Sequence, residues 1–191
     1  MSLLILGLVV FLGVHSIRMV APDWRELQMR QRGVLIWKGV YTLVSLLGLA
    51  LIIHGYGEAR MAPVLLWQPP LWTRHLAALM MLVAFICVAA TYIPGNWLKA
   101  RVGHPMLAGV KTWAMAHLLT NGTLADLVLF GSFLLWAILQ FRTNRLRDKA
   151  AGVVRVHLSL TRDALVIVLG VAGTGVFMMF LHQLLIGVRP F

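Results

Sequence analysis

The chain has little charge, and it is poorest in acidic residues. Charged residues make up 12% of its 191 positions, with 6 acids against 17 lysines and arginines, while 60% are hydrophobic. A typical soluble domain has about 25% charged and about 45–50% apolar residues. A soluble fold of this size could not bury so much apolar surface. The composition therefore predicts a membrane protein, for which lipid is the solvent.

Cysteine is almost absent, and so are several common catalytic motifs. The single Cys87 lies within an apolar run, which excludes an intrachain disulfide and a zinc site made of paired cysteines. The chain has no Walker loop, no HExxH zinc motif and no close carboxylate pair for general acid–base catalysis. The glycine-rich stretch 170–175 follows no strand, so it predicts close helix packing rather than a nucleotide-binding loop.

Long apolar runs are what the chain has instead. A membrane-spanning helix needs about 20 predominantly apolar residues. Five segments satisfy this requirement, and a sixth, shorter one is bounded by helix start and stop signals: 3–21, 34–53, 76–93, 105–119, 124–141 and 164–186. We therefore predict an all-α fold, a polytopic transmembrane helical bundle of about six spanning helices that forms a single domain over residues 1–191. The first run lacks the features of a cleavable signal peptide, so we expect it to remain as a helix.

The basic residues are unevenly divided between the connections. The first, third and fifth connections, with the adjoining helix ends, hold fourteen lysines and arginines, and the opposite side holds only Arg60, Arg74 and Arg189. The positive-inside rule then places both termini outside, in the periplasm if the membrane is a bacterial inner membrane. The net charge of +11 is explained by the orientation of the helices in the membrane and by contact with anionic lipid. We therefore expect the lipid bilayer and not nucleic acid as partner.

Seven histidines are unusual in so apolar a chain. An ionisable group inside a membrane is costly and by default indicates a functional site. His15, His117 and His182 fall within predicted helices. The others lie at helix ends or in a basic loop: His54, His75, His104 and His157. Histidines from facing helices can bind haem iron, although each could instead make an interhelical hydrogen bond of about 0.6–2 kcal/mol.

The helix predicted at 105–119 has two distinct faces. One face carries residues at spacings of four, three, four and four: Met106, Val110, Trp113, His117 and Asn121. His104 and Lys111 share another face, about 140° from His117. The first face could line a flat apolar cofactor or pack against a neighbouring helix. Lys111 could snorkel to the inner membrane face or meet an anionic group such as a haem propionate.

Asp126 is a carboxylate beside a predicted spanning helix. We expect it in the first turn of the helix at 124–141, where the helix dipole favours an anion. It could instead orient a nearby histidine.

Several motifs together resemble the NnrU family. Residues 13–16, Gly-Val-His-Ser, resemble its first signature, and residues 103–127, which begin Gly-His-Pro, resemble its central one. Further matches lie at 52–55, 66–70, 92–97 and 129–133, so the resemblance covers nearly the whole chain. It implies an integral membrane protein linked to bacterial denitrification, in the reduction of nitrite and nitric oxide.

The NnrU family is in turn similar to plant 15-cis-zeta-carotene isomerase, a membrane haem b enzyme. That resemblance implies haem b as the cofactor and makes His15 and His117 the axial ligands of its iron. It also assigns His54 and His104 to two further histidines of the pattern. With Lys111 and Trp113 from the helix at 105–119, these residues complete the candidate cofactor site.

Depth along the helices complicates this ligand pair. At 1.5 Å per residue, His15 lies about 10 Å above the inner end of the first helix, and His117 about 20 Å above the inner end of the fourth. Helix tilt or offset must absorb the difference if both bind one iron. The pairs His15 with His104, or His117 with His182, are alternatives.

The resemblance leaves several functions open. Ala114 stands where the isomerase has a cysteine implicated in a redox ligand switch, so the same isomerisation mechanism is in doubt. The chain could be a redox or isomerase-like protein that acts on a lipophilic small molecule, or a non-catalytic accessory or assembly factor for a nitrogen-oxide reductase. Its His-Pro helix start is also similar to that of isoprenylcysteine-type membrane methyltransferases, but Gly103 replaces their arginine and the segment after the fifth predicted helix is basic where they carry an acidic motif.

Overall fold

The computed structural model of the protein describes residues 1–190. Its helical elements are α1 (Ser2–Val20), α2 (Pro22–Arg32), α3 (Val34–Met61), α4 (Trp72–Tyr92), α5 (Trp97–Val102), α6 (Pro105–Thr120), α7 (Leu124–Ala150), α8 (Leu160–Val176), the π-helical turn η1 (Phe177–Leu181) and α9 (His182–Ile186). Extended pairing within this range is confined to an isolated bridge between Leu65 and Thr123. The predicted all-α class is confirmed.

Five helices are long and apolar enough to cross a membrane: α1, α3, α4, α7 and the continuous run from α8 through α9. Only 11–33% of the residues in their apolar windows are buried inside the protein, so each of these helices keeps apolar side chains at the surface, as helices surrounded by lipid do. The helix α6 has 16 residues, about 24 Å, and packs between α4 and α7 as a shorter sixth member. The predicted transmembrane bundle is confirmed.

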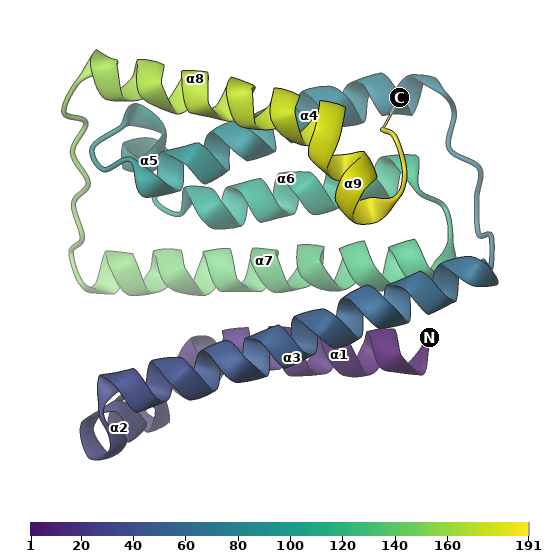
Figure 1. Ribbon diagram of the computed structural model, residues 1–191. Coiled ribbons are helices and arrows are strands. Elements are labelled where there is room, and N and C mark those ends of the chain that lie inside the picture. The colour runs from purple at the N-terminus through teal and green to yellow at the C-terminus, as the bar shows by residue number, and fades with distance from the viewer. Residues whose placement is uncertain (191) are drawn as a thin grey trace.

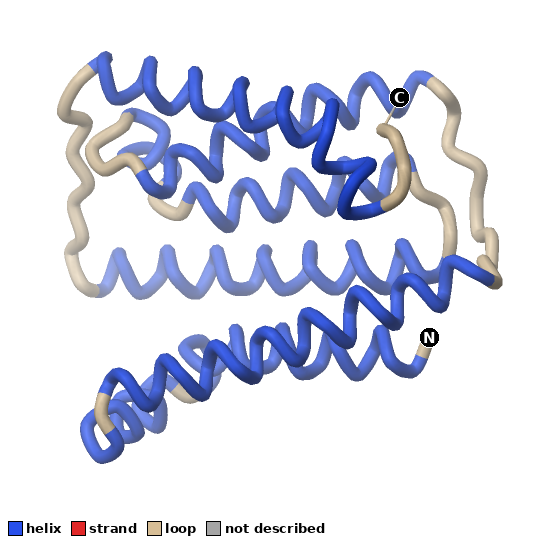
Figure 2. The backbone as a smooth tube through the Cα atoms, viewed as in Figure 1, coloured by secondary structure: helices blue, strands red, loops and turns tan. Residues whose placement is uncertain are grey.

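The long helices lie side by side in successive layers (Figure 1). The pair α1 and α3 contacts α7, which contacts α6, followed by α4 and then α8. Figure 2 shows the connections gathered at the two ends of the bundle. One end, which we call the basic end, holds α2, α5 and the α7–α8 connection. The other, the terminal end, holds both termini, the connection 62–71 and the α6–α7 turn. The three basic connections thus share one end, as their charge predicted.

The helices extend beyond the apolar runs that predicted them. The helix α3 continues to Met61 and α7 to Ala150, and the connection expected at 22–33 is itself the helix α2, with Pro22 in its first turn and basic residues in its last. These predicted boundaries were wrong because hydropathy detects only the part of a helix that faces lipid. Polar turns at the membrane surface satisfy the same backbone hydrogen bonds.

Glycines allow two helix pairs to pack backbone to backbone. A Cβ atom on Gly48 of α3 would lie 2.8 Å from the backbone nitrogen of Phe11 in α1. A Cβ atom on Gly170 of α8 would lie 2.6 Å from a side-chain carbon of Ile86 in α4. The close packing predicted for the stretch 170–175 is therefore confirmed at Gly170.

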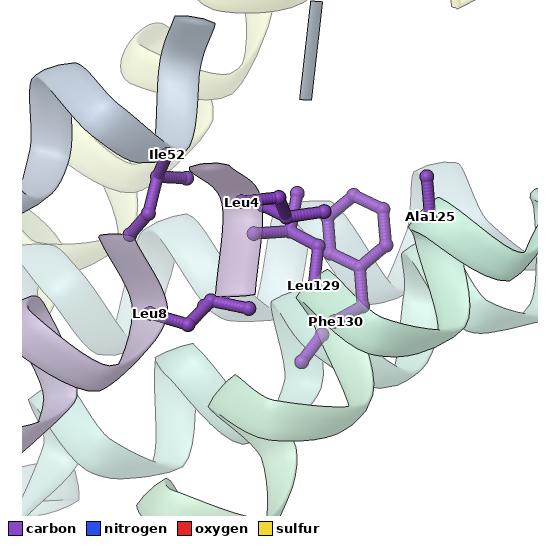
Figure 3. Packing of buried hydrophobic residues seen from close by; sticks show 7 residues of the cluster. Leu4, Leu8, Ile52, Ala125, Leu129 and Phe130 are labelled. Carbon is purple, nitrogen blue, oxygen red and sulfur yellow. The ribbon is translucent and has the colours of Figure 1, made fainter. Parts of the chain in front are cut away.

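The buried apolar core joins α1, α3, α6 and α7 toward the terminal end (Figure 3). It consists of Leu4, Leu8, Ile52, Ala114, Ala125, Leu129 and Phe130. These residues come from the first turns of α1 and α7 and from the later turns of α3 and α6, which meet at that end. The terminal half of the bundle thus holds the buried apolar core, and we call it the filled half.

Candidate functional site

A cavity of about 450 Å³ lies in the basic half of the bundle, between α1, α2 and α3 on one side and α6 and α7 on the other. Figure 1 shows α3 leaning away from α7 toward its α2 end. The polar and aromatic residues that line the cavity are His15, Arg18, Arg25, Trp37, Lys38, Tyr41, Trp136, Gln140 and Asn144. We call it the His15 cavity. Its volume lies in the range of small-molecule and cofactor sites, about 300–1,000 Å³.

His15 presents one free ring nitrogen. Its Nδ1 lies 2.6 Å from the carbonyl oxygen of Phe11, one helical turn earlier. Because a carbonyl can only accept, Nδ1 carries the proton and Nε2 keeps its lone pair. Over residues 1–190, Nε2 has no hydrogen-bond partner. The ring is held by Phe11, which stacks on it at 4.2 Å, and by Tyr41, whose centroid lies 5.2 Å away. This is the form of histidine that binds a metal.

Two polar atoms of α7 are buried beside the same cavity without a partner. They are Nε1 of Trp136 and Oε1 of Gln140. The Gln140 residue is only 8% exposed, so water reaches it poorly. A buried polar group without a hydrogen bond costs about 1–3 kcal/mol. A ligand in the His15 cavity with polar groups of its own could satisfy both atoms.

The cavity is also strongly positive. Arg18, Arg25 and Lys38 line it, and Arg147 lies close enough to the two arginines to be repelled by them. Arg147 is positioned by Asn144, to whose Oδ1 it donates over 2.5 Å. None of the described lining residues is acidic, and none of the three lining cations has an ion-pair partner within residues 1–190. The electrostatic potential therefore favours an anionic ligand group.

His117, the second predicted ligand, lies in a different environment. Its Nδ1 is 2.9 Å from the carbonyl oxygen of Trp113, in the same four-residue pattern as His15. Its ring stacks on Phe130 of α7 at 4.6 Å, and Trp113 contacts it at 5.3 Å. His117 is not among the described residues that line the His15 cavity. It belongs to the filled half of the bundle.

A row of aromatic rings connects the two histidines. From His15 the centroids follow one another through Phe11, Phe133 and Trp113 to His117, at distances of 4.2, 5.8, 5.4 and 5.3 Å. Within residues 1–190 the two imidazoles share no ring contact with each other and are linked only through these three rings.

Asp126 closes the region around His117 at the terminal end. The Tyr56 hydroxyl donates to its Oδ1 over 2.5 Å, and the Thr123 backbone nitrogen and hydroxyl donate to its Oδ2 over 3.0 and 2.6 Å. Thr123 and Asp126 form a capping box at the start of α7. The expected place of Asp126 in the first turn is confirmed. Within residues 1–190 no hydrogen bond joins it to a histidine.

Two more residues of the predicted site lie outside the His15 cavity. His54 is exposed on α3, with its Nε2 3.3 Å from a carboxylate oxygen of Glu58. The ammonium of Lys111 lies 3.7 Å above the ring of Phe141 in α7, a cation–π contact. Neither residue is among the described lining of the cavity.

His104 begins α6 and faces α7. Its Nε2 lies 2.7 Å from Oδ2 of Asp148, in an ion-pair contact that lacks hydrogen-bond geometry. The same Oδ2 accepts a hydrogen bond from Arg155 over 2.5 Å. Burial lowers the pKa of the His104 imidazole below its usual value, and the nearby carboxylate opposes this only in part. His104 therefore connects α6 to α7 and, like His54, is not among the described residues of the His15 cavity.

The α7 wall of the cavity is absent from the set of residues predicted from sequence. Trp136, Gln140 and Asn144 follow one another at spacings of four, so they form a polar stripe along an apolar helix. Polar side chains within a spanning helix are rare because they are costly. This stripe is the signal in the sequence that could have located the site. Tyr41 was missed as well, and only the fold shows its contact with His15.

Comparison with known proteins identifies a family. The family model described as NnrU protein matches residues 3–190, nearly the whole chain. Comparisons with curated proteins and with solved structures give no match. The family predicted from the motifs at 13–16 and 103–127 is confirmed.

Proposed function

The chain belongs to the NnrU family, and from that premise we propose that it is a haem b-binding membrane protein whose cofactor lies in the His15 cavity. One observation carries the proposal. A neutral imidazole with a free Nε2, an unpaired buried indole N–H and three cations without acidic partners converge on one cavity of about 450 Å³.

The residues of the cavity fit the chemistry of haem b, a flat apolar ring with two propionates. His15 would supply an axial nitrogen, and Arg18, Arg25 and Lys38 would meet the propionates. Bound haem supplies redox chemistry at its iron, and the protein contributes binding, orientation and electrostatics.

The chain's own groups prepare the site in three ways. The hydrogen bond from Nδ1 of His15 to the Phe11 carbonyl fixes the tautomer and the direction of Nε2. The rings of Tyr41 and Trp136 pack around the imidazole, with centroids 5.2 and 6.1 Å from it, and hold its orientation. Nε1 of Trp136 can donate to a propionate oxygen.

The family resemblance adds His117 as the second axial ligand. In the structure His117 does not line the His15 cavity and is linked to His15 only through a row of three aromatic rings. Ligation by both histidines therefore requires a rearrangement around His117, whereas ligation by His15 alone does not. The spin state of the iron separates these two arrangements, because two imidazole ligands produce a low-spin spectrum.

The cellular role follows from the family. We propose a bacterial inner-membrane protein with its basic end in the cytoplasm and both termini in the periplasm. It would take part in denitrification as a redox or isomerase-like protein that acts on a nitrogen oxide or on a lipophilic molecule. A non-catalytic accessory factor would instead co-purify with a nitrogen-oxide reductase and would need no haem of its own.

The test is a reduced-minus-oxidised visible spectrum of the detergent-purified protein from haem-replete cells. We expect a Soret band and reduced α and β bands in the wild type, and their loss in His15→Ala. His54→Ala is the matched control, because this histidine is exposed and makes only a local contact with Glu58. A colourless wild-type protein that is well folded would overturn the proposal and favour the accessory role.

A further inference from the structure

A second cavity, of about 590 Å³, lies at the basic end between α5, α7 and the α7–α8 connection. We call it the basic cavity. At 100° per residue, its α7 residues Phe141 and Arg145 lie about 100–180° around the helix from Gln140 and Trp136 of the His15 cavity, and the two cavities share no lining residue. The two cavities are therefore separate, and a ligand of one does not account for the other.

The basic cavity holds far more positive than negative charge. Five cations line it: Arg101, Arg142, Arg145, Lys149 and Arg155. Asp148 is the single carboxylate of the described lining, and it already lies 2.5 Å from Arg155 and 2.7 Å from His104. The other four cations have no acidic partner within residues 1–190. Such a concentration of charge attracts an anion.

Aromatic rings hold two of the guanidinium groups. Arg101 lies over the ring of Trp97 at 5.8 Å, and Arg145 lies over the ring of Phe141 at 5.9 Å. A cation–π contact orients a guanidinium without using its N–H donors. Those donors form a planar fork that matches the oxygens of a phosphate group. The arginines are thus placed for a phosphate ligand.

The position of the basic cavity favours a phosphate carried by a lipid. The cavity begins at Phe141, where the apolar part of α7 gives way to Arg142 and the basic residues that follow. Leu146 and Val153, 59% and 47% exposed, add apolar surface beside the cations. The half-exposed Trp97 marks the head-group level of the membrane. Basic pockets between spanning helices bind anionic lipid head groups.

We propose that the basic cavity binds the phosphate of an anionic phospholipid, with the start of its acyl chains along Phe141 and Leu146. The arginine N–H groups recognise the phosphate group itself, so a soluble phosphate could accept from the same donors. This site does not depend on haem binding, because the two cavities have no lining residue in common.

The experiment measures lipid binding to the full chain, purified and delipidated in a neutral detergent. Thermal unfolding is followed while phosphatidylglycerol, phosphatidylcholine or inorganic phosphate is added. Ligand binding to the folded state raises the melting temperature. We expect phosphatidylglycerol to stabilise the wild type and phosphatidylcholine not to, with the difference reduced at high salt.

Two variants locate the site. Arg142→Gln combined with Arg145→Gln should weaken the apparent affinity for phosphatidylglycerol by about tenfold or more, as the loss of charge-assisted hydrogen bonds implies. Arg101→Gln on α5 should weaken it in the same direction, which guards against misfolding of the double variant. The control is Arg30→Gln with Arg32→Gln on α2, which removes the same charge at the same end of the bundle.

The outcomes separate the sources of the phosphate. If inorganic phosphate alone stabilises the wild type and the cavity variants abolish that effect, the phosphate site stands and its ligand is soluble. If the α2 control loses as much affinity as the cavity variants, the attraction is diffuse and the proposal fails. It fails also if both lipids act alike and inorganic phosphate has no effect.

Discussion

His15 and His117 have the same local structure and opposite surroundings. Each lies within a helix of the bundle and has its Nδ1 within hydrogen-bonding distance of the carbonyl four residues earlier. His15 faces a cavity with unpaired cations and unpaired polar atoms. His117 lies against Phe130 and Trp113 in the filled half. The hydrogen bond within the helix thus fixes which ring nitrogen of the histidine keeps its lone pair. The neighbouring helices determine whether a ligand can reach that nitrogen.

The two halves differ because the helices and connections are joined differently at the two ends of the bundle. At the terminal end, the connection 62–71 is bound to the α6–α7 turn through the Leu66 nitrogen, which donates to the Gly122 carbonyl over 2.8 Å. Tyr56 and Asp126 join α3 to α7 at the same end. Toward the basic end α3 leans away from α7 (Figure 1), and α2 supplies Arg25 to the space between them. A filled core and a cavity result within one bundle.

The largest effect should come from removing a large buried side chain from the filled half. Phe130→Ala removes a ring that is 5% exposed and that contacts His117 and Trp113. We expect a loss of about 3–5 kcal/mol in the free energy of unfolding, measured by denaturant titration in detergent micelles. Ile138→Ala on the same helix is the control, because this side chain is 47% exposed. Equal losses in both variants would contradict the division into two halves.

A smaller effect should follow from Tyr56→Phe. This change removes the hydroxyl that donates to Asp126 and leaves a buried carboxylate with one donor fewer. We expect a loss of about 1–3 kcal/mol, seen as a lower melting temperature. Tyr92→Phe is the matched control, since Tyr92 is 75% exposed. If Tyr56→Phe melted like the wild type, the hydrogen bond would not hold α3 to α7.

A mutation in the His15 cavity should change the stability of the haem-free protein in the opposite direction. Gln140→Leu replaces a buried amide whose Oε1 has no partner by an apolar side chain of similar size. Haem-free protein should be as stable as the wild type or more stable, by up to about 1 kcal/mol. A variant that is clearly less stable without haem would show that Gln140 has a structural partner instead.

The spans, the family and several local features were predictable from the sequence, and the cavity was not. Apolar runs located the helices, the helix dipole placed Asp126 in a first turn, and the glycine-rich stretch 170–175 predicted close packing. The cavity depends on the packing of α1, α2 and α3 beside α6 and α7, which places Lys38 and Gln140 on the walls of one cavity although about a hundred positions separate them. Local periodicity carries no information on that packing. Only the stripe of Trp136, Gln140 and Asn144 pointed to the α7 wall.

The smallest effect should be the pH dependence of stability that His104 contributes. This residue belongs neither to the His15 cavity nor to the buried apolar core. Burial holds the pKa of its imidazole below the unfolded value, near 6.5. The unfolded chain therefore binds more protons, and the free energy of unfolding should decrease as the pH falls below about 6.5. His104→Gln should make the melting temperature less sensitive to pH between 7 and 5 than the wild type (about the range in which histidine titrates). An unchanged pH profile would assign the acid sensitivity to other groups.

The most direct test of the His15 cavity as the cofactor site is the haem content per protein of His15→Ala beside His117→Ala, each purified from haem-replete cells. We predict that His15→Ala lacks the Soret band, whereas His117→Ala keeps a haem signal, with a changed spin state if His117 is the second ligand. A His15→Ala protein with the haem content and spectrum of the wild type, beside a colourless His117→Ala, would contradict the account and place the cofactor among the rings around His117.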